Sequence, residues 1–155
     1  MTTTNHRPIV KIILTHDDGK VPVYANDGDA GADVSAVSYS GPERALRGFY
    51  FDEKLKRVDS IEEEDYIIEP GQTVMIDLGL KIALHPGWEM QVRSRSGLAK
   101  RGLVVANAPG TIDSGYRGPC MVLLRNNSPV GRVIKPGTRI AQFDLKRAPQ
   151  ANFVR

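Results

Sequence analysis

The segment EPGQTVMIDLGLKIALHPGW, residues 69–88, carries the clearest structural pattern in this chain of 155 residues. Apolar side chains occupy alternate positions from 74 to 84, and Asp77 and Lys81 fall between them. Alternation with a period of two indicates strands that bury one face and expose the other. A Pro-Gly pair lies near each end of the segment, where the chain is expected to turn. The segment therefore predicts half-buried β-strands bounded by turns.

The same alternation occurs in residues 10–14 and 88–92, and clusters of Gly, Pro, Asn and Asp separate the apolar segments at short spacing. This spacing is typical of an all-β sandwich or barrel. One helical signal stands out in SGLAKRG, residues 96–102, where Ser96 can cap a short helix and Gly102 can end it. We expect antiparallel β-structure with one short helix.

The length of the chain fits one domain, which we assign to residues 1–155. Residues 41–66 break the alternating pattern, because they are highly charged around the apolar run LRGFYF. We interpret them as an insertion in a loop or an added hairpin, and not as a second domain.

Composition and charge exclude several classes of protein. The net charge of +3 is spread over both signs without a basic run, so direct nucleic-acid binding is not indicated. The single cysteine, Cys120, excludes an internal disulfide and a cysteine-based zinc site. No P-loop or dinucleotide fingerprint occurs. No signal sequence and no apolar run of about 18 residues is present, so we expect a soluble protein inside the cell, with no membrane contact.

The segment RSRSGLAKRG, residues 93–102, is a candidate phosphate site. The first turn of a helix leaves backbone N–H groups without partners, and Arg93 and Arg95 add positive charge. The alternative is a capped surface helix with no ligand.

Two further segments carry charged groups beside glycines. In DGDAGADVSA, residues 27–36, three carboxylates could hold a hydrated Mg²⁺ near phosphates, although Asp and Gly also form plain turns. In KPGTRIAQFDL, Arg139 and Gln142 could reach an anionic group. An arginine at a strand edge is, however, usually only solvated.

The segment NAPGTIDSGYRGP, residues 107–119, contains one carboxylate, Asp113, among glycines. Glycines let backbone N–H and C=O groups approach a planar base closely, and the Asn107 amide could add to its recognition. Asp113 and the flat ring of Tyr116 would then lie beside the bound sugar. A β-hairpin with an exposed Asp and a packed Tyr would require no ligand.

Taken together, four motifs resemble one family. DAGADVSA, RSRSGLA, NAPGTIDSGYRG and GTRIAQF, in this order, resemble motifs one to four of the homotrimeric dUTP diphosphatases (dUTPases). The resemblance implies a jelly-roll, β-clip type of barrel that assembles as a homotrimer with active sites at subunit interfaces. It also implies hydrolysis of dUTP to dUMP and pyrophosphate with Mg²⁺ bound to the triphosphate, which supplies the dTTP precursor and limits uracil in DNA.

The resemblance also implies residue roles. Asp113 would orient and deprotonate the attacking water, and Tyr116 would stack on the deoxyribose. Asp33 would hold a water of the Mg²⁺ or brace the site. The uracil would be read by Asn107, Gly110, Thr111 and Ile112. The triphosphate would be bound by Arg95, Ser96, Gly97, Arg139 and Gln142.

The sequence departs from the family pattern in two respects. Acids that are common in the family are replaced by Gly115, Pro119 and Thr138, and we expect these changes to alter turns only. The family usually ends in a glycine-rich arm with an arginine and a phenylalanine, whereas no glycine follows Gly137 here. We hypothesise that Arg47, Gly48 and Phe49 of the 41–66 insertion take the place of that arm.

Two other functions compete with dUTP hydrolysis. A dCTP deaminase has a similar fold, but its catalytic glutamate should fall near Leu123, where this chain has no acid. A dUTPase-like regulator would bind nucleotide with weak or no catalysis, and would contact a protein partner through residues 41–66. For either activity on nucleotides we expect a cytoplasmic location, or a nuclear one in a eukaryotic host.

Overall fold

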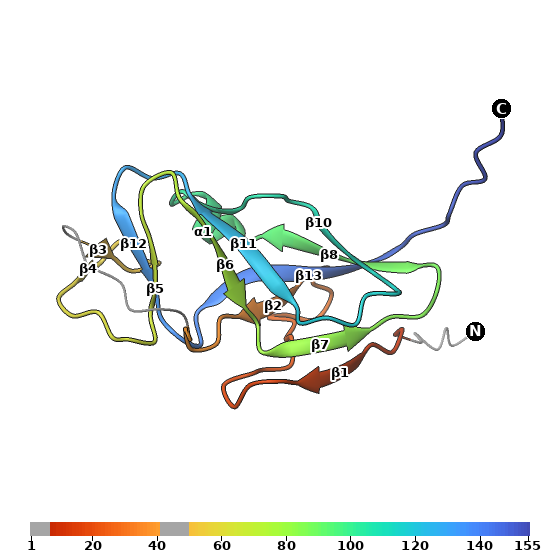
Figure 1. Cartoon of the computed structure of the whole chain (residues 1–155), viewed down its shortest axis with the longest axis horizontal. Helices are drawn as coiled ribbons and strands as arrows, with labels where there is room; N and C mark the ends of the chain where they lie inside the picture. Colours follow the sequence, from red (N-terminus) through yellow and green to blue (C-terminus); the bar gives the residue numbers. More distant parts are fainter. Residues whose placement is uncertain (1–6, 41–49) are drawn as a thin grey trace.

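The computed structural model describes residues 7–40 and 50–155, and the regular secondary structure of these residues is almost entirely β-strand (Figure 1). Within them the one α-helix is α1 (Ser96–Ala99). The strands are β1 (Lys11–Leu14), β2 (Ala32–Ser35), β3 (Tyr50–Phe51), β4 (Arg57–Val58), β5 (Tyr66–Ile68), β6 (Thr73–Asp77), β7 (Leu80–Ala83), β8 (Trp88–Ser94), β9 (Leu103–Val105), β10 (Gly110–Asp113), β11 (Met121–Asn126), β12 (Gly131–Ile134) and β13 (Arg139–Arg147). The predicted β-architecture with one short helix is confirmed.

Two sheets supply most of one hydrophobic core. The strand orders are β10-β8-β13-β2 and β6-β11-β9, and the two sheets form a sandwich around this shared core. Val92 and Phe143 from the first sheet and Ile76 and Leu124 from the second belong to the same buried cluster. Because each strand sends alternate side chains to this core, the outward face of each sheet can be polar.

The alternating segment 69–88 forms β6 and β7, as predicted. Its apolar positions from 76 to 84 are almost completely buried, and Met75 on the other parity is 59% exposed. Gly79, with φ +64°, separates the two strands and lets β6 pair with β11 and β7 with β1. Leu14, which the pattern places inward, is half exposed, because β1 pairs only with β7 and lies at the edge of the fold.

The sheet β10-β8-β13-β2 has one apolar face and one polar face. Met90, Val92 and Ile112 point into the core. Positions of the other parity carry polar side chains, and the strand register brings them onto one face: Asp33 and Ser35 on β2, Gln142, Asp144 and Lys146 on β13, Glu89, Gln91 and Arg93 on β8, and Thr111 and Asp113 on β10. The sequence motifs therefore meet on this polar face.

The described part of the segment 41–66 contains an antiparallel hairpin, β3–β4, whose first strand pairs in parallel with β12. Tyr50 is buried in a small cluster with Ile67 and Val133. Arg47, Gly48 and Phe49, which we hypothesised to replace the glycine-rich arm, lie outside the described residues. The assignment of 41–66 as an insertion stays a prediction.

The chain ends in residues 148–155, which have no regular secondary structure and extend away from the sandwich (Figure 1). Phe153 in this tail is 94% exposed. Within residues 7–40 and 50–155, no helix has the length and apolar character needed to cross a membrane.

Candidate functional site

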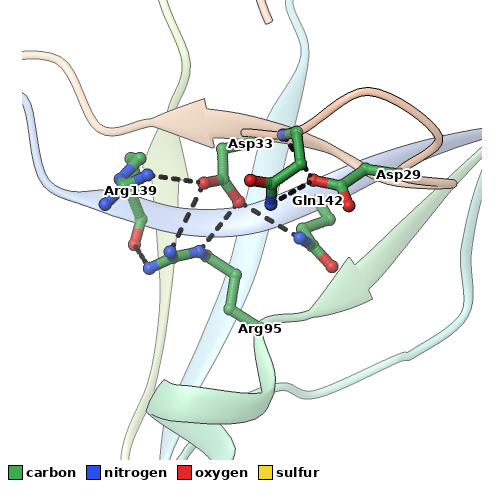
Figure 2. Close-up of polar contacts among 6 residues, drawn as sticks. Asp29, Asp33, Arg95, Arg139 and Gln142 are labelled. Atoms are coloured by element: carbon green, nitrogen blue, oxygen red, sulfur yellow. Dashed lines mark hydrogen bonds and ion pairs between the residues drawn. The ribbon is translucent and has the colours of Figure 1, made fainter. Parts of the chain in front are cut away.

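The Asp33 carboxylate is the centre of a polar cluster that joins three sequence motifs (Figure 2). Arg95 donates from Nε to Oδ1 at 2.9 Å and from Nη2 to Oδ2 at 3.3 Å. Arg139 donates from Nη1 to Oδ2 at 2.9 Å, and Gln142 from Nε2 to Oδ1 at 3.2 Å. Asp33 is 7% exposed, so its charge is compensated by these donors and hardly by water.

The pairing of distant strands explains why these side chains meet. Gln142 on β13 is the register neighbour of Asp33 on β2, so both project from the same face. Gly31 lies against the Gln142 side chain, and a Cβ at this position would come within 3.1 Å of the amide oxygen Oε1. A larger residue would displace the Gln142 amide. Arg95 directly follows β8, the neighbour of β13 on its other side.

The two arginines keep donors that Asp33 does not use. Within the described residues Arg95 donates three hydrogen bonds, two to Asp33 and one to the Arg139 carbonyl oxygen at 3.1 Å. A guanidinium has five N–H groups, so two remain. The Arg139 guanidinium donates one hydrogen bond to Asp33, and the Arg139 side chain is 57% exposed. The cluster therefore combines an internal carboxylate with free guanidinium donors that can bind an anion.

Helix α1 begins at Ser96, one residue earlier than a cap at Ser96 would require. Arg95 occupies the cap position with extended backbone, and no side chain caps the helix. The sequence-based assignment of Ser96 as the cap is therefore wrong, because β8 runs almost directly into the helix. Ser96 and Gly97 are exposed, and within the described residues their backbone N–H groups have no acceptor, as expected in a first helical turn.

The three carboxylates of residues 27–36 do not converge. Asp27 is exposed and pairs with Arg7. Asp29 accepts hydrogen bonds from the backbone and side chain of Asn26 and so closes a turn (Figure 2). Of the three carboxylates, only Asp33 contacts Arg95 and Arg139. No group of three or more His, Cys, Asp or Glu residues with metal-ligand geometry occurs in the part of the chain that the structure describes.

The segment 107–119 is not a two-stranded hairpin. Its one strand, β10, pairs with β8, whereas β9 and β11 pair with each other. Ile112 is buried in the core, and Thr111 and Asp113 are exposed on the polar face. Within the described residues the Asp113 carboxylate has neither a hydrogen bond nor an ion pair. Gly110 packs beneath Asn107, whose Nδ2 would lie 3.1 Å from a Cβ at Gly110.

The turn after β10 holds Tyr116 in a defined position. Its hydroxyl donates to the Pro119 carbonyl at 3.0 Å, and its ring lies directly over Gly118. The Arg117 guanidinium donates to the carbonyls of Ser114 and Tyr116, both at 2.7 Å, and so fastens the turn. Sequence reasoning missed Arg117, because nothing in its pattern distinguishes it from a solvated arginine.

Asp113 and the Asp33 cluster lie on the same face but far apart. Asp113 is level with Glu89 on β8 and Lys146 on β13, whereas Asp33 is level with Gln142. Four positions along β13 and three strand-to-strand steps separate them, which amounts to roughly 20 Å. One chain thus brings together Asp33, Arg95, Arg139 and Gln142, but Asp113 and the turn that holds Tyr116 lie apart from this cluster.

A second charged group on the polar face was also missed. Asp144 is 3% exposed and lies 2.8 Å from Arg93 Nη1 and 3.1 Å from Lys146 Nζ. The sequence does contain a pattern that indicates this group, because Gln142, Asp144 and Lys146 alternate with the apolar residues Phe143 and Leu145. These pairs fill the space between the two groups of candidate residues.

Two cavities differ in chemistry. One of about 290 Å³ lies beside Asp33 and is lined also by Lys20, Ser35 and Arg139. Another of about 750 Å³ is mainly apolar and is lined by Met90, Phe143 and other residues from the opposite face of the sheet. The smaller cavity is the one that belongs to the charged cluster.

Comparisons with known proteins identify the family of this chain. A protein-family model described as dCTP deaminase-like matches residues 30–148. A deoxyuridine 5'-triphosphate nucleotidohydrolase of Clostridium tetani is 36% identical over 145 residues, covering 93% of this chain and 82% of the relative. The protein of the same name from Chlamydia pneumoniae is 40% identical, with 88% and 78% covered. The chain belongs to the dUTPase family.

A solved structure shows the same fold. A mutant form of the dUTPase from phage phi11 of Staphylococcus aureus, described with a structural Mg(II) ion, matches with a TM-score of 0.72 at 17% identity, covering 95% of both chains. The relatives named above are dUTPases rather than deaminases. In accord with them, β11 carries no acid, and Leu123 at the position considered for a deaminase glutamate is register neighbour to Met75.

Proposed function

We propose that this chain hydrolyses dUTP to dUMP and pyrophosphate. The observation that supports the proposal most strongly is the Asp33 cluster, in which two guanidinium groups keep free donors beside the exposed N–H groups of Ser96 and Gly97. A triphosphate is the kind of ligand that such an arrangement stabilises. The relatives that are 36% and 40% identical are named deoxyuridine 5'-triphosphate nucleotidohydrolases, and these names indicate dUTP as the substrate.

The segment 107–119 would bind the uracil and the sugar. Gly110, Thr111 and Ile112 would offer backbone groups to the base edge, together with the Asn107 amide. A cytosine amino group would leave these groups unpaired, which is an efficient form of discrimination. Tyr116 would lie under the deoxyribose and leave no room for a 2'-hydroxyl. The hydrogen bond from Tyr116 to Pro119 supports this role, since it holds the ring in place.

Asp113 would act as the general base. Its carboxylate is exposed and, within the described residues, has no partner that would compete with a water molecule. A positioned base contributes about a hundredfold to ten-thousandfold in rate. No protein acid is needed for the leaving group, because pyrophosphate bound to a metal ion leaves without protonation.

The residues present fit a Mg²⁺ ion that is bound mainly by the substrate. This ion keeps most of its waters and needs only one or two protein carboxylates. Asp33 accepts four hydrogen bonds from Arg95, Arg139 and Gln142, so it would have to release one of them to hold a water of the ion. Mg²⁺ would neutralise charge on the phosphates and on the pyrophosphate leaving group. Asp33 would orient a metal-bound water, while Arg95, Arg139 and Gln142 would hold the phosphate oxygens.

We infer that the complete site is formed by more than one copy of the chain, as the homotrimer expected from the sequence requires. Asp113 must reach a water beside the α-phosphorus, yet it lies roughly 20 Å from the cluster proposed for the phosphates. Neighbouring copies can supply the two halves across a head-to-tail interface. The mass of the particle in solution shows whether the chain forms the oligomer that this arrangement requires.

We further infer the domain organisation and the location of the protein. Residues 1–155 would form one dUTPase-like domain with an insertion at 41–66, and the insertion offers a surface for a protein partner. A cytoplasmic location would suit an enzyme that acts on free nucleotides.

Pyrophosphate release measured with dUTP, dCTP, dTTP and UTP at matched concentrations tests the proposed function. We expect turnover of dUTP alone, lost in Asp113→Asn. Tight binding of dUTP without turnover by the unmodified chain would instead favour a regulator that acts through a partner.

A further inference from the structure

The Arg132 side chain is a buried cation that has no carboxylate at ion-pair distance among the described residues. It is 0% exposed and lies in the middle of β12, between β3 and β5. Among the described residues no ion pair involves it, and its Nε atom has no hydrogen-bond acceptor. Burial lowers the pKa of the guanidinium from its ordinary value. The nearby Asp52 and Glu53 carboxylates oppose this lowering of the pKa only in part. A buried charge without a direct ion pair is destabilising, so a specific contact made by Arg132 should account for its presence.

Arg132 joins two segments that are far apart in sequence. Its Nη1 donates to the Arg101 carbonyl at 2.8 Å, and its Nη2 donates to the Asp52 carbonyl at 2.9 Å. These residues are 31 and 80 positions from Arg132. We call the three groups, the Asp52 carbonyl, the Arg132 guanidinium and the Arg101 carbonyl, the Arg132 bridge.

One end of the bridge is the turn of the β3–β4 hairpin. The Asp52 carboxylate accepts hydrogen bonds from the backbone of Lys54 at 2.9 Å and Lys56 at 2.7 Å, which shapes the turn. The hairpin also packs on β12 directly, because the Tyr50 ring lies against Gly131, where a Cβ would come within 2.6 Å of it. The Asp52 carbonyl is therefore held at a fixed position relative to Arg132.

The other end of the bridge is the segment that leaves helix α1. The Arg101 N–H donates to the Leu98 carbonyl, and its guanidinium donates to the Gly97 carbonyl at 3.3 Å. The helix has only four residues, too few to be stable through its own hydrogen bonds. Contacts at its end thus contribute to the placement of Arg95, Ser96 and Gly97 at its start.

We propose that Arg132 is a positioning residue, which couples the β3–β4 hairpin to helix α1 and so holds Ser96 and Gly97 in place for the β- and γ-phosphates. The role of the helix in phosphate binding rests on the proposed function, but the coupling itself does not. On this basis the hairpin contributes to triphosphate binding indirectly, through Arg132 and helix α1, and does not contact the nucleotide.

The test compares Arg132→Met with the unmodified chain and with Arg147→Met, which replaces an exposed arginine that stacks on Trp88. Binding of the non-hydrolysable α,β-imido analogue of dUTP should weaken about tenfold in Arg132→Met, which corresponds to about 1.4 kcal/mol. Binding of dUMP should change less than about twofold, since dUMP lacks the outer phosphates. Equal weakening of both ligands would reduce Arg132 to a general structural role and overturn the proposal.

Hydrogen exchange of the ligand-free protein provides a readout that does not depend on the proposed function. The amides of Lys100, Arg101 and Gly102 should exchange about tenfold faster in Arg132→Met, while those of β8 and β13 stay unchanged. Unchanged exchange at α1 in a folded variant would contradict the coupling.

Asp52→Ala is the second variant, for use if Arg132→Met does not fold. It loosens the turn through the Lys54 and Lys56 contacts and should produce the same selective changes at smaller size. If it leaves both exchange and analogue binding unchanged, the proposal is wrong. If the unmodified chain binds neither nucleotide, the proposed function fails, and the exchange measurement still decides the coupling.

Discussion

Arg95 and Asp33 are 62 residues apart in sequence, yet the Arg95 guanidinium makes two hydrogen bonds to the Asp33 carboxylate, at 2.9 and 3.3 Å. The carboxylate accepts hydrogen bonds from some of the N–H groups of Arg95 and Arg139 and leaves others for a phosphate. Because the arginines retain free donors, a triphosphate can bind without breaking the pair. The carboxylate keeps two cations ordered beside each other, which is a form of preorganisation.

Asp33→Asn should raise the Mg²⁺ concentration needed for half-maximal turnover of dUTP by about tenfold, because an amide attracts a hydrated cation much less than a carboxylate does. The kcat/KM measured over a series of Mg²⁺ concentrations checks this. Asp27→Asn is the matched control, since Asp27 is exposed and bound only to Arg7. A Mg²⁺ dependence that is the same in both variants would argue against a role of Asp33 near the metal.

Much of the fold could be predicted from local patterns. Alternation identified β6, β7 and β8, because a period of two reports the burial of one face whatever the strand pairs with. Which strands pair is a property of distant segments, so local patterns did not show that β10 pairs with β8 instead of forming a hairpin. Local patterns also left open whether Asp27 and Asp29 join Asp33 or form turns. In the structure Asp29 closes a turn with Asn26.

The site was predicted in composition but not in geometry. The motifs named Asp33, Arg95, Arg139 and Gln142 separately, and only the register of β2, β8 and β13 places them together. The cap at Ser96 was assigned wrongly, because capping preference is a local tendency that the continuing strand overrides. Arg132 gave no signal, since a single arginine in GRVI resembles any surface residue of an edge strand.

Gly118→Ala should impair the discrimination of dUTP from UTP. The Tyr116 ring lies over Gly118, and a Cβ there would come within 2.6 Å of the ring carbon that bears the hydroxyl. The ring must therefore move, and its contact with the sugar should loosen. The ratio of kcat/KM for dUTP to that for UTP should fall about tenfold, within the range that polar and steric mismatches in a site produce.

Gly115→Ala is the control for this prediction. It lies in the same turn, and no atom lies within 4 Å of a Cβ built at this position. Its kinetic constants should match those of the unmodified chain. If both variants change the ratio equally, the effect comes from the turn as a whole and not from the Tyr116 ring.

The stability of the protein should fall above about pH 9 through Cys120. Burial raises the pKa of this thiol to about 11 from its ordinary value of 9.0. Between these two values the unfolded chain loses the thiol proton while the folded chain keeps it, so unfolding becomes more favourable as the pH rises. The slope approaches about 1.4 kcal/mol per pH unit.

Urea unfolding at several pH values between 8 and 11 measures this slope, and Cys120→Ala should lack it. The variant should be less stable at neutral pH, because a buried side chain has been shortened. The difference in free energy of unfolding between the two proteins should therefore narrow as the pH rises. A difference that stays constant across this range would show that the thiol does not titrate as described.

Two inactive variants should restore activity when they are mixed. Asp113→Asn removes the proposed base, and Arg95→Gln removes a phosphate contact that lies roughly 20 Å away in the same chain. If each site takes its two halves from different copies, random assembly at equal amounts gives about a quarter of the sites both intact halves. Turnover of dUTP should recover to about a quarter of the unmodified value after joint refolding. Each variant refolded alone, and the two mixed without refolding, should stay inactive. No recovery in an assembled mixed oligomer would mean that one chain supplies both halves, and the inferred sharing of the site between copies would be wrong.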